Sequence, residues 1–149
     1  MALQISVVTD SIAALDVSGL SILDIHEIPP DVTRGTPVLF PEPVNFVTDF
    51  SMTRDSFGGG SVAKMTVLYT LHYTFCYTQI GAARTGLDAY IGAVEMAALI
   101  LDAVLDIDTF SGGIDIQPIE VSEFGPVPDP AGNQYLGCRF AFQVQEYVN

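Results

Sequence analysis

The chain has 149 residues, of which 49% are apolar and 15% are charged, so we expect one folded domain over residues 1–149 and exclude a disordered chain. Its 18 acidic and 5 basic residues give a net charge of −13, and nine acids and no base lie between Arg84 and Arg139. Specific nucleic-acid binding requires clustered Lys and Arg to displace counterions from phosphates, and this chain cannot supply that cluster.

The first part of the chain predicts one helix followed by short extended segments. Apolar residues recur at three- and four-residue intervals over 2–15, which is typical of an amphipathic helix. A short strand is expected over 20–28, ended by Pro29 and Pro30, and a turn-rich loop over 31–36. The segment 37–43 (PVLFPEP) is too rich in proline for a central strand, so we interpret it as an edge strand or an extended segment.

The most informative pattern is the alternation from Met65 to Thr78. Every odd position is apolar or aromatic, and the even positions are mostly threonine, which predicts one long strand with an apolar and a polar face. Such a strand would span roughly 46 Å, longer than the core of a small domain needs. We therefore expect it to project from the body or to continue a wall shared with neighbouring subunits.

A second strand is expected just before the long one, over 45–53, with a glycine-rich tip over 56–61 between them. Together they predict a hairpin. At its tip, Arg54, Asp55 and Phe57 combine a charge pair with an aromatic ring that would dock on another subunit. The alternative interpretation is an ordinary turn with a solvated ion pair that contributes little.

A helix is predicted from Gly86 to about Leu105, capped by Thr85. On the helical wheel Met96 and Ile100 flank an acidic stripe that contains Leu99, opposite a main apolar face made of these residues: Tyr90, Val94, Ala97, Leu101, Val104 and Leu105. A helix that is apolar over most of its circumference is buried on more than one side. We therefore expect Met96, Leu99 and Ile100 to lie at a contact with a neighbouring copy.

The last third predicts a strand over 114–121, interrupted by Pro118, a turn-rich loop over 125–132 (GPVPDPAG), and a final alternating strand over 134–148. The order of elements indicates an α+β fold. We expect a mostly antiparallel sheet with one long projecting strand or hairpin, flanked on one face by two helices.

No motif for catalysis, a cofactor or a metal ion is present, so we predict a protein that is not an enzyme and has no cofactor-binding or metal residues. His72 lies on the polar face of the long strand and is interpreted as a surface or interface histidine. Cys76 and Cys138 fall in strand patterns, so we expect two reduced core cysteines in a cytosolic protein. Neither a membrane helix nor a signal peptide is expected.

Five segments in this order resemble the tail terminator (tail completion) proteins of long-tailed bacteriophages: IHEIPPDV, PVLFPEP, DFSMTRDSFGGG, TGLDAYIGAVEMAALILDAVL and GNQYLGCRFAFQVQEY. The segment that most resembles the family is Gly-x-x-Tyr-Leu-Gly, from Gly132 to Gly137, at the start of the last strand. The order and spacing of these segments carry the resemblance.

This resemblance implies a structural virion protein, assembled in the host cytoplasm and located in the tail and neck. It would form a homohexameric ring on the head-proximal end of the tail tube, contact the tail tube protein and a neck or head-completion protein, and stop tube polymerisation. Genome DNA would pass through a central channel without specific binding, and no membrane would be involved. An acidic surface would suit such a channel by keeping the duplex from sticking, although acidity also serves solubility.

Two alternatives stay open. In the first, the chain is another neck or head-completion protein, or the tail tube protein itself. In the second, from a different class, it is a small-molecule binding domain or an enzyme with a pocket beside the long strand.

Overall fold

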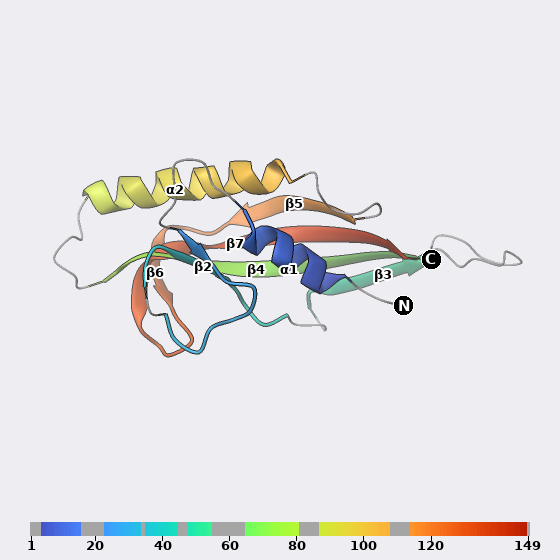
Figure 1. Ribbon diagram of the computed structural model, residues 1–149, viewed down its shortest axis with the longest axis horizontal. Helices are drawn as coiled ribbons and strands as arrows, with labels where there is room; N and C mark the ends of the chain where they lie inside the picture. The colour runs from blue at the N-terminus through green and yellow to red at the C-terminus, as the bar shows by residue number, and fades with distance from the viewer. Residues whose placement is uncertain are drawn as a thin grey trace, which may run out of the picture.

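The computed structural model describes residues 4–15, 23–33, 35–44, 48–54, 65–80, 87–107 and 114–148. These residues form a seven-stranded mixed sheet and two helices (Figure 1). In chain order the elements are α1 (Ile5–Ala13), β1 (Asp24–Ile25), β2 (Val38–Pro41), β3 (Phe50–Arg54), β4 (Met65–Gln79), α2 (Leu87–Leu105), β5 (Ile114–Val121), β6 (Gly125–Pro128) and β7 (Gln134–Val148).

The predicted α+β class is wrong, because the fold is dominated by its sheet. Strands account for 47% and helices for 24% of the described chain. Two strands of 15 residues each, β4 and β7, make up much of this sheet. The parallel pairing of β1 with β2 makes the sheet mixed, while the other pairings are antiparallel.

The long strand β4 begins and ends within one residue of its predicted bounds, but it does not project. It pairs with β7 along its whole length, from Met65 opposite Val148 to Gln79 opposite Tyr135. Its other edge is covered by β3 at one end and β2 at the other. The strand is therefore the centre of the sheet, and the expectation of a projecting strand is corrected.

The proline-rich segment also lies deeper than expected. All four residues of β2 are buried, and the strand lies between β1 and β4 in the sheet order β1-β2-β4-β7-β5. Proline is tolerated there because Pro37 precedes the strand and Pro41 ends it, so neither interrupts the ladder in its middle. Likewise, β6 is a short strand paired with β7 where the sequence predicted only a loop.

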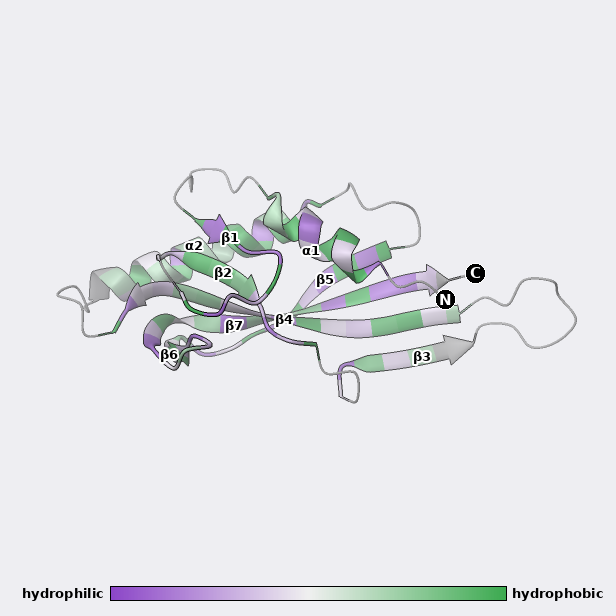
Figure 2. Ribbon diagram, turned by 60° about the horizontal axis from the view of Figure 1, so that its bottom comes forward, coloured by the Kyte–Doolittle hydropathy of each residue, from purple (hydrophilic) through white to green (hydrophobic). Residues whose placement is uncertain are grey.

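One face of the sheet carries both helices (Figure 2). The odd residues of β4 from Val67 to Phe75 point into this core together with alternate residues of β7. Val8 and Ile12 of α1, four residues of α2, Leu39 of β2 and Ile114 of β5 complete it. On the opposite face, a smaller cluster buries Cys76 at one end of the sheet: its other members are Val38, Phe40, Val127 and Tyr135.

Both cysteines are free and buried, as predicted for core residues. Neither described helix has the length and the apolarity that crossing a membrane requires.

Candidate functional site

Among the described residues, several exposed large apolar side chains gather on the side of α2 that faces away from the sheet. Five large apolar side chains on it are between 37% and 62% exposed; they are Tyr90, Ile91, Val94, Leu99 and Leu105, and we call them the outer face of α2. The opposite side of the same helix is buried in the core through Ala93, Met96, Ala97, Ile100 and Val104. The helix is thus apolar on two sides, and the sheet covers one of them.

This arrangement corrects the predicted contact residues. Met96 is 5% exposed and Ile100 is fully buried, so both belong to the core of the subunit and neither is available to a neighbour. Leu99 is 39% exposed and remains a candidate. Tyr90 and Leu105, which the wheel assigned to the main apolar face, lie on the surface instead.

Small residues explain which side of α2 meets the sheet. Ala93 and Ala97 are buried beside Met96 and Ile100, and short side chains let the helix approach closely. A side chain at Gly92 would collide with the Tyr77 hydroxyl of β4. Short side chains at these three positions therefore let this side of α2 pack against the sheet.

Exposed acids lie within the outer face of α2, between Leu99 and its other four members. Glu95, Asp102 and Asp106 are exposed on the same helix. At its N-terminal end the ring of Tyr90 packs edge-on against Phe124, with 6.1 Å between ring centroids, which fixes that aromatic side chain against the β5–β6 connection. The outer face of α2 is thus an apolar surface interrupted by negative charges, which suits a partner with both apolar and basic groups.

The predicted hairpin tip is only partly placed. Arg54 is the last residue of β3, opposite Met65 of β4, while Asp55 and Phe57 lie outside the described residues. Within β3, Phe50 stacks on Tyr69 with 5.2 Å between ring centroids, and Met52 is 50% exposed. This strand therefore presents one large apolar side chain near the sheet edge.

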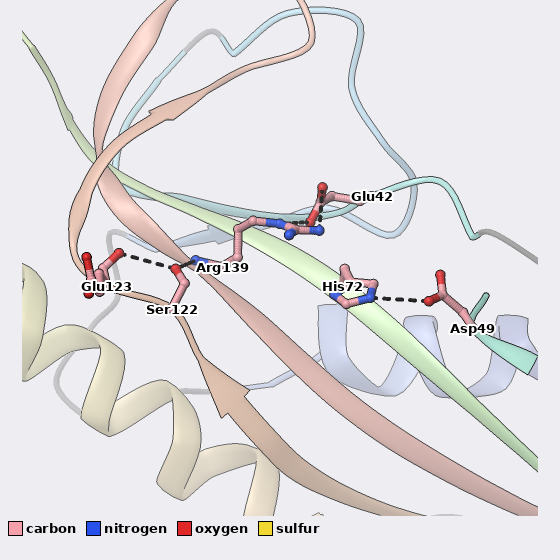
Figure 3. Close-up of polar contacts among 6 residues, drawn as sticks. All are labelled: Glu42, Asp49, His72, Ser122, Glu123 and Arg139. Carbon is pink, nitrogen blue, oxygen red and sulfur yellow. Dashed lines mark hydrogen bonds and ion pairs between the residues drawn. The ribbon is translucent and has the colours of Figure 1, made fainter.

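His72 lies on the face of the sheet opposite the helices, because the odd-numbered residues of β4 point into the core and the even-numbered ones point away from it. Its Nε2 atom is 3.5 Å from Oδ1 of Asp49, next to β3 (Figure 3). Nearby, Arg139 of β7 donates two hydrogen bonds to the Glu42 carboxylate, at 2.8 and 3.1 Å. Both pairs tie connecting segments to the sheet, and neither forms a nucleophile–base arrangement.

Two open hollows lie at the end of the sheet where β2 and β6 are. The larger, of about 590 Å³, is lined by the prolines at 29, 30, 43, 128 and 130 together with Asp31, Glu42, Thr74 and Asp129. The smaller, of about 320 Å³, contains His26, whose Nε2 is 3.2 Å from Asp24 Oδ2. Across the described ranges, no three His, Cys, Asp or Glu side chains form a group that would hold a metal ion.

Asp129, the most buried acid of the larger hollow, is occupied by structural hydrogen bonds. Its carboxylate accepts from the backbone N–H groups of Thr33 (3.1 Å) and Asn133 (2.8 Å) and from the Asn133 amide (3.3 Å). Burial would raise the pKa of Asp129, but these hydrogen bonds to the charged form lower it below the ordinary value. Through these hydrogen bonds the ionised Asp129 side chain holds the loop before β2 against the β6–β7 turn.

Neither a protein-family model nor a curated protein matches this chain. Its surfaces, its charge and its five family-like sequence segments are the features that bear on its function.

Proposed function

We propose that this protein is a structural, ring-forming component of a bacteriophage tail that acts as a tail terminator. It caps the head-proximal end of the tail tube and joins the tail to the neck. The observation that carries the proposal is the outer face of α2, where five large apolar side chains lie in water on an isolated subunit. Apolar surface of this kind marks a contact with another protein.

The charge distribution supports a channel through which DNA passes without binding. On the face of the sheet without helices, the side chains of β4 and β7 are largely neutral; they include Thr66, Thr70, Gln143 and Gln145. Arg139, a basic residue on this face, is held by Glu42. A duplex finds few positive groups to neutralise its phosphates there, so its counterions stay in place and it does not adhere.

In this proposal the protein works through geometry and has no catalytic step. Lateral surfaces close the ring, one ring face contacts the tail tube protein, and the other contacts a neck or head-completion protein. Its location is the virion tail and neck, after assembly in the host cytoplasm.

The test is the assembly state of the purified protein, measured by sedimentation and by negative-stain imaging. We expect closed rings whose mass is six times the 16.0 kDa subunit. Filaments would instead identify a tube protein, which polymerises without a stop. A subunit that stays at 16.0 kDa at all concentrations and is stabilised against heat by a small molecule would overturn the proposal in favour of a ligand-binding domain.

A further inference from the structure

The larger hollow, at the end of the sheet where β2 and β6 lie, is rich in hydrogen-bond acceptors and poor in donors. Five of its nine lining residues are prolines, which have no backbone N–H group. Two more backbone N–H groups are already used, because Glu42 donates to the carbonyl oxygen of His72 (2.7 Å) and Asp129 donates to that of Asn133 (2.9 Å). The hollow therefore offers a ligand mainly carbonyl and carboxylate oxygens.

The larger hollow also has an excess of negative charge. Asp129 is 4% exposed and ionised, and its carboxylate accepts hydrogen bonds from uncharged groups alone. Asp31 is exposed and makes no ion pair with any described residue. The third carboxylate, that of Glu42, is neutralised by Arg139. Two of the three carboxylates thus have no counter-charge within the described part of the chain.

Thr74 of β4 gives a separate indication that a polar group binds here. The residue lines the larger hollow and is 5% exposed. Its hydroxyl makes no hydrogen bond within the described ranges. A buried hydroxyl without a partner costs free energy, which a ligand group within hydrogen-bonding distance would recover.

These features select the chemical class of the ligand. A metal ion is disfavoured, because the described acids do not gather into a group that would hold one. A phosphate or carboxylate group would meet like charge and few donors. The volume of about 590 Å³ is in the range of sites for organic ligands. A guanidinium group fits best, because it has five N–H donors, no acceptor and a permanent positive charge, and its weak hydration permits contact with proline rings.

The surroundings of the hollow favour a protein as the source of this group. The hollow is open, whereas a free small molecule is largely enclosed by its site. Ile28, which directly precedes Pro29 and Pro30, is 72% exposed and provides apolar contact area beside the hollow. A second copy of this chain is a poor source, since it would bring 18 acids and 5 bases to an acidic hollow.

We propose that the larger hollow binds the guanidinium group of an arginine side chain on a different protein, while an apolar residue next to that arginine packs on Ile28. Asp31 and Asp129 supply the opposite charge, and the Thr74 hydroxyl accepts a hydrogen bond. This inference rests on the proposed function only for the identity of the partner, which is then a tail or neck protein with an exposed arginine.

Methyl NMR of threonine-labelled protein, titrated with N-acetyl-arginine N-methylamide, tests this site. The methyl signal of Thr74 should shift and saturate at millimolar concentrations of this capped arginine. Thr70 lies on the same face of β4 outside the larger hollow, and its signal should not move. The capped citrulline compound is the matched control, because it replaces the guanidinium by an uncharged group of nearly the same shape.

Two variants test the charge and the apolar contact. Asp31→Asn should weaken binding of the capped arginine about threefold, whereas Asp115→Asn, at an exposed acid of β5 outside the hollow, should leave it unchanged. A short peptide with leucine next to arginine should bind about fivefold more tightly than the capped arginine. Ile28→Ser should remove that gain and leave the affinity for the capped arginine as it was.

Three results would overturn the inference. If the capped arginine does not shift the Thr74 signal, the hollow is not a guanidinium site, and rings seen by sedimentation would leave the ring proposal standing. If the citrulline compound shifts Thr74 as strongly, the hollow does not recognise the charge. If the peptide binds no more tightly than the capped arginine, the hollow takes a free guanidinium compound and not a protein segment. Conversely, Thr74 shifts without any ring would discard the ring proposal and keep the arginine site.

Discussion

The carboxylate of Glu146, three residues from the end of the chain, accepts a hydrogen bond from the backbone N–H of Gln4, with 2.9 Å between Gln4 N and Glu146 Oε1. Gln4 is the N-cap residue of α1, and its own side chain makes no capping bond. Glu146 is 2% exposed on β7, so a buried carboxylate from the opposite end of the chain caps the helix. The partial positive charge of a helix N-terminus favours a carboxylate at this place.

This contact predicts that α1 depends on Glu146. A helix of nine residues is too short to be stable alone, so its docking to the sheet decides whether it forms. In Glu146→Leu the cap is lost, and we expect α1 to lose about 1 kcal/mol of local stability. Glu146→Gln keeps an acceptor oxygen and is the matched control.

Amide hydrogen exchange over residues 5–13 measures the effect. The amides of α1 should exchange about fivefold faster in Glu146→Leu than in the natural protein, while those of β4 keep their rates. If the α1 amides of Glu146→Leu exchange as slowly as those of the natural protein, the Glu146 carboxylate does not hold the helix.

A second prediction concerns two glycines that face each other across strands β6 and β7. Gly125 and Gly137 are paired in register, yet a side chain on Gly137 would collide with the backbone carbonyl oxygen of Phe75, whereas Gly125 has open space. The collision involves backbone at the point where β4 shifts register against β7, so no side-chain rotation relieves it. Gly137→Ala should therefore cost about 3 kcal/mol of unfolding free energy, and Gly125→Ala less than about 1 kcal/mol.

Urea denaturation of both variants measures this difference in unfolding free energy. Because both residues are strand glycines that become alanine, changes in the unfolded chain largely cancel. Similar midpoints for the two variants would contradict the close approach of Gly137 to Phe75.

A third prediction follows from the buried thiols. For Cys76, burial first and then the charges of Asp129 and Cys138 raise the pKa to about 12, and burial raises the pKa of Cys138 to about 12. The unfolded thiols ionise near their ordinary pKa of 9.0. Between these values the unfolded chain releases protons that the folded chain keeps, so stability is full below pH 9 and falls as the pH rises.

At pH 9.5 the two thiols together should cost about 1–2 kcal/mol of unfolding free energy relative to pH 7.5, measured by urea denaturation. A Cys76→Ala/Cys138→Ala variant is the control and should lose clearly less over the same interval. An identical loss in both proteins would assign the pH dependence to other groups, such as Tyr69 and Tyr73, whose pKa values burial also raises.

The sequence predicted the positions of the long elements well, because alternation and helical periodicity act locally. The bounds of β4, β7 and α2 lie close to those expected from their patterns. The order of the strands within the sheet was not predictable in the same way. Whether Val38 lies at an edge or between two strands depends on β1, which contributes two paired residues and hardly any pattern.

The candidate site was predicted in part. The sequence indicated that α2 is apolar on two sides. A helical wheel does not show which side of a helix faces the sheet, so Met96 and Ile100 were assigned to the surface and Tyr90 to the core. The small residues at positions 92, 93 and 97 were the available signal, since a helix packs most closely where its side chains are shortest. Strand β6 was not predicted because its segment contains Pro126 and Pro128. The strand tolerates both prolines because they occupy its exposed, alternate positions.

The two sides of α2 give a last prediction from adjacent residues. Leu99 is 39% exposed and Ile100 is fully buried, so the same substitution at each position should act on different properties. Leu99→Asp adds a charge to a surface, and we expect its melting temperature to stay within about 2 °C of the natural protein. Ile100→Asp buries an unpaired charge in the core and should prevent folding.

On assembly, Leu99→Asp should weaken self-association at least tenfold in sedimentation, because it places a further negative charge beside Glu95 and Asp102 and removes apolar contact area. Leu99→Ala is the matched control and should weaken association less, since it removes the contact area without the charge. If Leu99→Asp is folded and assembles with unchanged affinity, the outer face of α2 is not a contact between subunits, whatever other surface closes the ring.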